Sequence, residues 1–222
     1  MKQDISKLIK SLILKSLGRN VCAILLIGSA NSDDFYELSD LDYILILKKI
    51  KAKDLNVIAK IRDSVSIKSG IDIDIKPCTE LELNISRKYP IDFFHNWTLQ
   101  MIINGKIKLI YARKKMNIQL SPQKKLSTLY AMNYFIVKLG KYFSLNEVYL
   151  RGKLKKPTCR DFFKVVGSGC FCVAKFYLSY RGTLAYTRKE IIEELTKINE
   201  NPSPLVKIEL LRKNKKFNVS QN

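Results

Sequence analysis

The sequence predicts an α+β domain followed by a bundle of helices, and two observations lead to this fold class. Up to Arg113, short apolar runs rich in β-branched residues alternate with helical patterns, whereas beyond Ser121 the patterns are helical throughout. The 222 residues are 46% hydrophobic and 27% charged, which is the balance of a globular protein. We therefore expect two domains, at residues 1–115 and 116–222.

The N-terminal domain is expected to contain two helices and four short strands. Apolar residues recur at helical spacing before Gly18 and again before Gly70, so each glycine is expected to end a helix. The runs between them are too short for helices and rich in β-branched residues, which favours buried strands. In chain order, we expect a helix over 5–17, strands over 21–27 and 41–47, a helix over 55–69, and strands over 71–75 and 106–111.

The C-terminal domain is expected to be an all-α bundle. Ser121 followed by Pro122 is typical of a helix cap and a first-turn proline, and the pattern that follows runs to about residue 146. Thr187 and Glu190 are spaced as a capping box. The remaining signals are a second box-like pattern at 158–161 and turns at Gly182 and 201–204.

The charge is strongly unbalanced, with 40 Lys and Arg against 20 Asp and Glu and a formal net charge of +20. A surface this basic attracts polyanions, so nucleic acid is a plausible partner; the alternative is that the lysines only decorate an ordinary surface. We expect no membrane span, because no segment has the roughly 18 uninterrupted apolar residues that one requires. The five cysteines include no C-x-x-C pair, which predicts a cytoplasmic protein without a disulfide framework or a zinc site.

Two pieces of sequence suggest phosphoryl-transfer chemistry. Asp40 and Asp42 are separated by one residue at the mouth of an expected strand, where alternation places both on one face and both could reach a metal ion. Upstream, an expected strand runs into Gly28 and Ser29, and the segment after them should begin a helix, so that backbone amides and a hydroxyl could hold a triphosphate. Each piece has an ordinary alternative: a solvated strand entry for the first, a common turn for the second.

A third strand also carries acidic residues. Asp72 and Asp74 interrupt the otherwise apolar run before Pro77. Burying them without partners would be costly. They therefore either reach a metal ion or lie on the solvent face of their strand.

Taken together, these pieces resemble the signature of the DNA polymerase beta-like nucleotidyltransferases. That signature has a hydrophobic residue, Gly and Gly or Ser, then about a dozen residues, then Asp-hydrophobic-Asp/Glu-hydrophobic. Here Gly28 and Ser29 are followed by ten residues and then by Asp40, Leu41 and Asp42. The family's third carboxylate lies on a later strand with a proline a few residues on. The Ile71-Asp72-Ile73 run with Pro77 fits this pattern and favours Asp72, with Asp74 as the alternative.

The resemblance implies a short mixed sheet flanked by helices, with an appended helical bundle, and a magnesium-dependent reaction. Asp40 and Asp42 would bind two Mg²⁺ ions and Asp72 would complete the catalytic site. Gly28, Ser29 and Ser39 would bind the NTP, with ATP expected. The stretch Ala30–Phe35 departs from many family members that modify small molecules, because it lacks their arginine or glycine.

The acceptor is left open by the sequence. Family members act on RNA or tRNA, on antibiotics and on proteins, and the net charge of +20 favours a polyanionic acceptor such as RNA or tRNA. An antibiotic or another small molecule is the alternative, and a catalytically idle module that binds nucleic acid or a toxin is a further one. Lys138 and Lys141 are candidates for phosphate contacts, whereas His95, the one histidine, is expected to be a packed polar residue.

Overall fold

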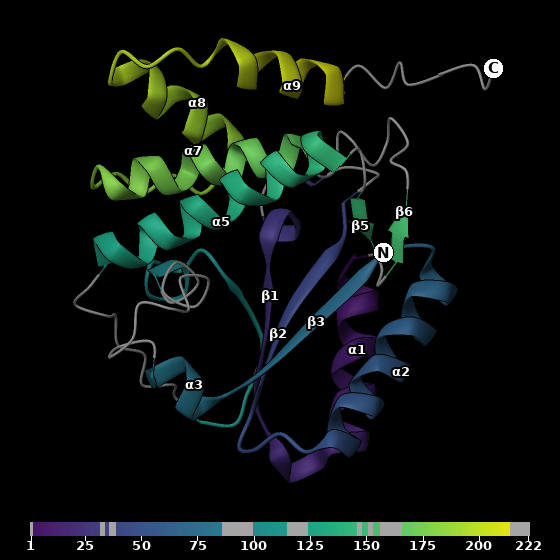
Figure 1. Cartoon of the computed structure of the whole chain (residues 1–222). Helices are drawn as coiled ribbons and strands as arrows, with labels where there is room; N and C mark the ends of the chain where they lie inside the picture. The colour runs from purple at the N-terminus through teal and green to yellow at the C-terminus, as the bar shows by residue number, and fades with distance from the viewer. Residues whose placement is uncertain are drawn as a thin grey trace, which may run out of the picture. The chain divides into compact units, whose positions relative to one another are not determined.

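The computed structural model describes residues 2–31, 34–35, 39–85, 100–114, 124–145, 148–150, 153–155 and 166–213 of the chain (Figure 1). The chain separates into two compact units, Met1–Pro122 and Gln123–Asn222. The first unit contains a mixed β-sheet with helices and the second is mainly helical. The predicted combination of an α+β part with a helical part is confirmed.

The first unit is built on four strands in the order β3-β2-β1-β4. The strands are β1 (Val21–Ile27), β2 (Leu41–Leu47), β3 (Ile73–Thr79) and β4 (Lys108–Ala112). The β1 strand pairs antiparallel with both β2 and β4, whereas β3 runs parallel to β2. A parallel pair needs a long crossover, and here α2 (Ala52–Ser69) supplies it.

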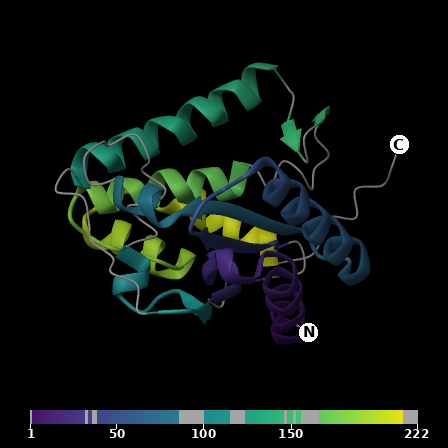
Figure 2. The same ribbon diagram turned by 90° about the horizontal axis from the view of Figure 1, so that it is seen from below.

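Two helices cover one face of this sheet. The first is α1 (Lys2–Leu17), which leads through η1 (Gly18–Asn20) into β1, and the second is α2. They pack against each other and lie side by side next to the sheet (Figure 2). The β1 strand ends in η2 (Gly28–Asn31), and α3 (Glu80–Ile85) follows β3.

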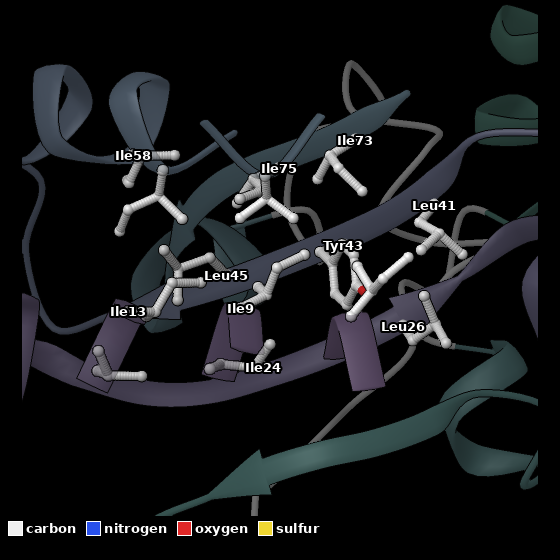
Figure 3. Close-up of a cluster of buried hydrophobic side chains, with 14 of the residues drawn as sticks. Ile9, Ile13, Ile24, Leu26, Leu41, Tyr43, Leu45, Ile58, Ile73 and Ile75 are labelled. Atoms are coloured by element: carbon white, nitrogen blue, oxygen red, sulfur yellow. The ribbon is translucent and has the colours of Figure 1, made fainter. Parts of the chain in front are cut away.

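The main hydrophobic core lies between the sheet and these two helices (Figure 3). Alternate residues of β2 point into it, and Leu41, Tyr43 and Leu45 are fully buried there. The Tyr43 hydroxyl shares a 2.8 Å hydrogen bond with Ser6 of α1, which satisfies two buried polar groups. Burial raises the pKa of the Tyr43 hydroxyl, so it stays protonated.

The other face of the sheet has a smaller apolar cluster, which runs along β1 and includes residues of β2 and β3. Its members are Cys22, Ala23, Leu25, Ile27, Ile44, Ile46 and Cys78. Ile102, Ile107 and Ala112 pack against them. The helices α1 and α2 cover the opposite face of the sheet. The part of this face that lies outside the cluster therefore accommodates polar residues.

The bounds of β1 and β2 match the expectation, whereas the bounds of the other elements differ by a few residues. Two of these differences have local causes. The α2 helix begins at Ala52, ahead of the expected residue 55, because Asp54 accepts a hydrogen bond from the Lys51 amide and caps the first turn. The β3 strand begins at Ile73 and continues through Pro77, which a central strand would exclude. It is tolerated because β3 is an edge strand.

The second unit has its own helices and its own core. Its elements are α5 (Lys124–Leu145), β5 (Val148–Leu150), β6 (Lys153–Lys155), α7 (Ser168–Tyr180), α8 (Arg188–Lys197) and α9 (Ser203–Lys213). The helices α5 and α7 pack together along their lengths (Figure 1). The β5–β6 hairpin was not expected from the sequence. The capping box of Thr187 and Glu190 at the start of α8 is confirmed.

A largely buried carboxylate links α8 to α9. Glu209 accepts hydrogen bonds from Arg188 and Arg212, and the Arg188 guanidinium also lies 4.9 Å from the centre of the Phe171 ring. Burial would raise the pKa of the Glu209 carboxyl, but the two arginines outweigh it and lower the pKa. Ser121, Pro122 and the pattern at 158–161 lie outside the described residues. None of the helices within the described ranges is long and apolar enough to cross a membrane.

Candidate active site

Two strands of the first unit bring carboxylates together on the sheet face that α1 and α2 leave uncovered. In the parallel register of β2 with β3, Asp42 lies directly opposite Asp74. On its other side Asp42 is the partner of Ile27, the last residue of β1. Both carboxylates are partly exposed, with 24% of the Asp42 side chain and 44% of the Asp74 side chain accessible.

Gly28, the residue after β1, lies against the Asp42 carboxylate on one side of this site. Its φ angle is +73°, in the left-handed region that favours glycine. A Cβ atom at this position would lie 2.7 Å from Oδ2 of Asp42, which is closer than such atoms approach. The position therefore requires glycine twice, for its backbone angle and for the space that the Asp42 carboxylate fills.

Lys76 lies among the carboxylates. Its Nζ is 3.2 Å from Oδ2 of Asp74 and 3.7 Å from Oδ1 of Asp42. Burial alone would lower the pKa of the Lys76 ammonium, but the charges of Asp42, Asp74 and Asp40 outweigh it and raise the pKa above its usual value. The lysine is therefore charged at neutral pH and neutralises part of the negative charge of the site.

Asp40, Ser39 and Asp72 adjoin the same end of the strands. Ser39 is buried, with 8% of its surface accessible, and Asp40 follows it directly before β2. The Asp72 backbone carbonyl accepts a 2.9 Å hydrogen bond from the Leu41 amide, which continues the β2–β3 ladder to the point where Asp40 and Asp72 enter.

The carboxylate oxygens of this site suit a hard cation whose other ligands are phosphate oxygens. Within the described residues, no three Asp, Glu, His or Cys side chains are gathered tightly enough to hold a metal ion by themselves. Magnesium, however, is usually held by one or two carboxylates together with phosphate oxygens. Asp42 and Asp74 supply such a pair, and the Lys76 ammonium between them marks a place that favours a cation.

The structure places only some of the residues singled out in the sequence near this site. Asp40 and Asp42 lie with Gly28 at one end of the sheet, and the segment that starts at Gly28 and Ser29 is a four-residue 3-10 turn rather than the longer helix that we expected. Lys138 is exposed on α5. His95 and the side chain of Lys141 lie outside the described residues.

Lys76 is the site residue that the sequence analysis missed. The signal that would have revealed it is strand alternation, because Asp72, Asp74 and Lys76 are spaced two apart in a run whose intervening residues are isoleucines. A lysine in step with two candidate ligands is expected to share their face. The structure places Lys76 against both Asp74 and Asp42.

A solved adenyltransferase structure matches nearly the whole chain. It is a crystal structure of the spectinomycin adenyltransferase AAD(9) from Enterococcus faecialis with ATP and spectinomycin, and the match has a TM-score of 0.61 at 12% sequence identity. It covers 94% of this chain and 87% of the adenyltransferase. The chain has the fold of the DNA polymerase beta-like nucleotidyltransferases. The polymerase beta-like fold was the expectation from the sequence, and it is confirmed.

Two toxin–antitoxin structures match less well. The MntA–HpeT complex has a TM-score of 0.33 at 10% identity, over 64% of this chain and 95% of the other. The complex of the tri-AMPylated HEPN toxin of Shewanella oneidensis with MNT antitoxin has a TM-score of 0.31 at 9% identity, over 66% and 97%. These scores are too low to bear on the polymerase beta-like fold. No family model and no curated protein matches the sequence.

Proposed function

We propose that this protein is a nucleotidyltransferase that transfers a nucleoside monophosphate from an NTP to an acceptor hydroxyl. The acceptor oxygen attacks the α-phosphorus, the bond from that phosphorus to the β-phosphate oxygen breaks, and pyrophosphate leaves while a base takes the hydroxyl proton. The observation that carries the proposal is the position of Asp42, opposite Asp74 and against the backbone of Gly28. The fold shared with an adenyltransferase that was crystallised with ATP favours ATP as the nucleotide.

The proposed cofactor is magnesium, as two ions held by Asp40, Asp42 and a third carboxylate together with the nucleotide phosphates. When bound, magnesium neutralises phosphate charge and makes the acceptor hydroxyl easier to deprotonate. The protein's own part is to hold the carboxylates and the nucleotide in a fixed arrangement. The short strands serve this purpose, because Asp42 and Asp74 are each fixed by a backbone that is paired on at least one side.

For the third carboxylate we propose Asp74, with Asp72 as the alternative. This order reverses the preference that we took from the position of Pro77. The support for it is the register, which pairs Asp74 with Asp42, and the Lys76 ammonium that contacts both carboxylates. Asp74 or its neighbour would also help to remove the proton from the acceptor.

The triphosphate would bind at the β1–η2 turn. Gly28 allows close approach of the backbone, Ser29 offers a hydroxyl group, and the buried Ser39 adjoins Asp40. The stretch after Ser29 lacks the arginine or glycine of many family members that modify small molecules, so the proposed phosphate contacts are those of Gly28, Ser29 and Ser39.

We propose a polyanionic acceptor, such as RNA or tRNA. The support is the charge of the second unit, which carries 20 Lys and Arg against 7 Asp and Glu at residues 123–222. Charge of this density attracts nucleic acid and repels polycations such as aminoglycosides. Lys138, exposed on α5, is a candidate phosphate contact, and so is Lys141.

A small-molecule acceptor such as an antibiotic is the second candidate. The observation that favours it is the extent of the match to the spectinomycin adenyltransferase, which at 94% of this chain includes the helical unit as well as the sheet. The adenyltransferase structure contains spectinomycin.

A labelled-nucleotide assay tests these proposals. The protein is incubated with Mg²⁺ and each NTP labelled at the α-phosphate, with total cellular RNA in one series and spectinomycin in another. We expect label from ATP in the RNA, none with EDTA and none with Asp42→Asn. RNA binding should also weaken with salt, with a slope of at least about 3 in magnitude on logarithmic axes. Label in spectinomycin establishes the second candidate, and no transfer to either acceptor with any NTP indicates an idle binding module.

A further inference from the structure

Lys76 carries a function that the nucleotidyl-transfer reaction does not by itself require. It follows Asp74 on β3, and its side chain lies on the same face of the strand. The Nζ atom contacts Asp74 at 3.2 Å and Asp42 at 3.7 Å, so one ammonium group serves carboxylates from two different strands. These are the carboxylates between which, under the proposed function, a metal ion binds.

An ammonium group and a divalent cation make similar demands on this site. Each needs oxygen atoms around it, and each is attracted by the negative charge that two neighbouring carboxylates accumulate. The two cannot both fill the space between Asp42 and Asp74. With 46% of its side chain accessible, Lys76 has a path to solvent, and its flexible four-carbon stem lets the ammonium leave without moving the strand.

We propose that Lys76 is an internal counter-cation of the carboxylate site, which holds Asp42 and Asp74 together in the metal-free protein and is displaced when the metal ion binds. This inference rests on the proposed function, because it assigns the metal ion to the same carboxylates. Its consequence is that the free protein binds metal weakly. The nucleotide, whose phosphates contribute further ligands and attract the released ammonium, then favours metal binding.

The test is direct binding of Mn²⁺ to the nucleotide-free protein, measured by electron paramagnetic resonance of the free ion and by calorimetry. Lys76→Gln removes the charge and keeps much of the side chain. We expect it to bind Mn²⁺ at least about tenfold more tightly than the wild type, because unit charges at about 4 Å interact strongly near a protein surface. Lys76→Arg keeps the charge and should bind Mn²⁺ as weakly as the wild type.

A matched control separates a local effect from a change in net charge. Lys53 is exposed in the first turn of α2, at the opposite end of this helix from the segment that leads to Asp72 and Asp74, and Lys53→Gln removes the same charge. It should leave the affinity for Mn²⁺ unchanged. Adding Asp42→Asn to Lys76→Gln should abolish the gain, because the ion would lose a ligand.

A second measurement follows stability. In EDTA, Lys76→Gln should melt at a lower temperature than the wild type, because Asp42 and Asp74 then repel each other, and saturating Mn²⁺ should remove the difference. The inference is overturned if Lys76→Gln is folded and binds Mn²⁺ no more tightly than the wild type while the wild type still transfers nucleotide. If the wild type neither transfers nucleotide nor binds Mn²⁺ in the presence of ATP, the proposed function fails, and this inference fails with it.

Discussion

The two faces of the sheet in the first unit are made by the same strands and have opposite characters. On the face covered by α1 and α2, successive inward residues of β2 and β3 are aliphatic or aromatic and almost fully buried. On the other face, the apolar cluster directly adjoins the charged residues, because Ile27 pairs with Asp42 and Ile44 pairs with Lys76. Because side chains alternate along a strand, the same strands carry a hydrophobic core on one face and the candidate site on the other.

This difference shows how the position of the Asp42 carboxylate is fixed. Leu41 and Tyr43 fix β2 by packing, and the Asp42 carboxylate, whose own side chain is partly exposed, is held through the backbone between them. A site built in this way needs few contacts of its own. It also means that substitutions on the two faces should have separable effects, one on stability and the other on chemistry.

The largest effects are expected from two single substitutions on β2, one on each face of the sheet. Asp42→Asn should lower nucleotidyl transfer at least about a hundredfold, the usual worth of a fixed group that stabilises the transferred charge. It should leave the melting temperature close to that of the wild type. Leu45→Ala, on the buried face, should cost about 2 to 5 kcal/mol of unfolding free energy, measured by urea denaturation. Asp42→Asn activity above about a tenth of the wild-type rate contradicts the assignment of Asp42.

Gly28→Ala tests whether the backbone at the end of β1 determines the position of the Asp42 carboxylate on β2. The new Cβ would come to 2.7 Å from Asp42 Oδ2 and displace it, and a shift of about 1 Å can lower the rate about a hundredfold. Gly70→Ala is the matched control. Its φ of +68° is as unfavourable for alanine, but the added atom meets nothing within 4 Å. Both variants should lose about 1 to 3 kcal/mol of stability by denaturant titration. Equal activity of the two variants would show that the contact with Asp42 is unimportant.

Substitution of the third carboxylate is expected to lower turnover by a smaller amount, and the amount should differ between Asp74 and Asp72. Asp74→Asn should reduce turnover more than Asp72→Asn, because Asp74 is the residue opposite Asp42. The two positions are about 7 Å apart along the strand, so only one can be well placed on the same ion. Initial rates at saturating ATP give the ranking, and the reverse order would restore Asp72 as the ligand.

The smallest effect is expected on the buried face. Tyr43→Phe removes the hydrogen bond with Ser6 and should cost about 1 kcal/mol of unfolding free energy, with nucleotidyl transfer unchanged. In the double variant Ser6→Ala, Tyr43→Phe the losses should be less than additive, since both changes remove the same bond. A marked loss of transfer in Tyr43→Phe would show that the two faces are not separable.

Some elements of this architecture could be predicted from the sequence and others could not. The β1 and β2 strands have the expected bounds because each is a continuous apolar run that polar residues or glycine end abruptly. The β3 strand begins two residues and ends four residues later than expected, since acidic residues and Pro77 obscure its pattern and only pairing with β2 fixes where it begins. The helix α3 and the β5–β6 hairpin are too short to carry a hydrophobic period, so no sequence pattern indicated them.

The site was partly predictable for a similar reason. Asp40, Asp42 and Gly28 lie in one short stretch of chain, where a spacing can be read directly. The pairing of Asp42 with Asp74 depends on the register of two strands separated by a whole helix, which a local pattern does not encode. The same limit applies to Lys76, whose contact with Asp42 follows from that register.

The position of β3 has a consequence beyond catalysis. Among the described strands, β3 is at the edge of the sheet, where an unpaired backbone could template the addition of a strand from another molecule. Natural proteins guard such edges with charges and proline. Asp74, Lys76 and Pro77 stand at this edge, and Pro77 has no amide hydrogen to offer. The charged residues that the proposed chemistry uses thus also discourage aggregation, and a variant that replaces Lys76 and Pro77 together by valine should be the one that precipitates.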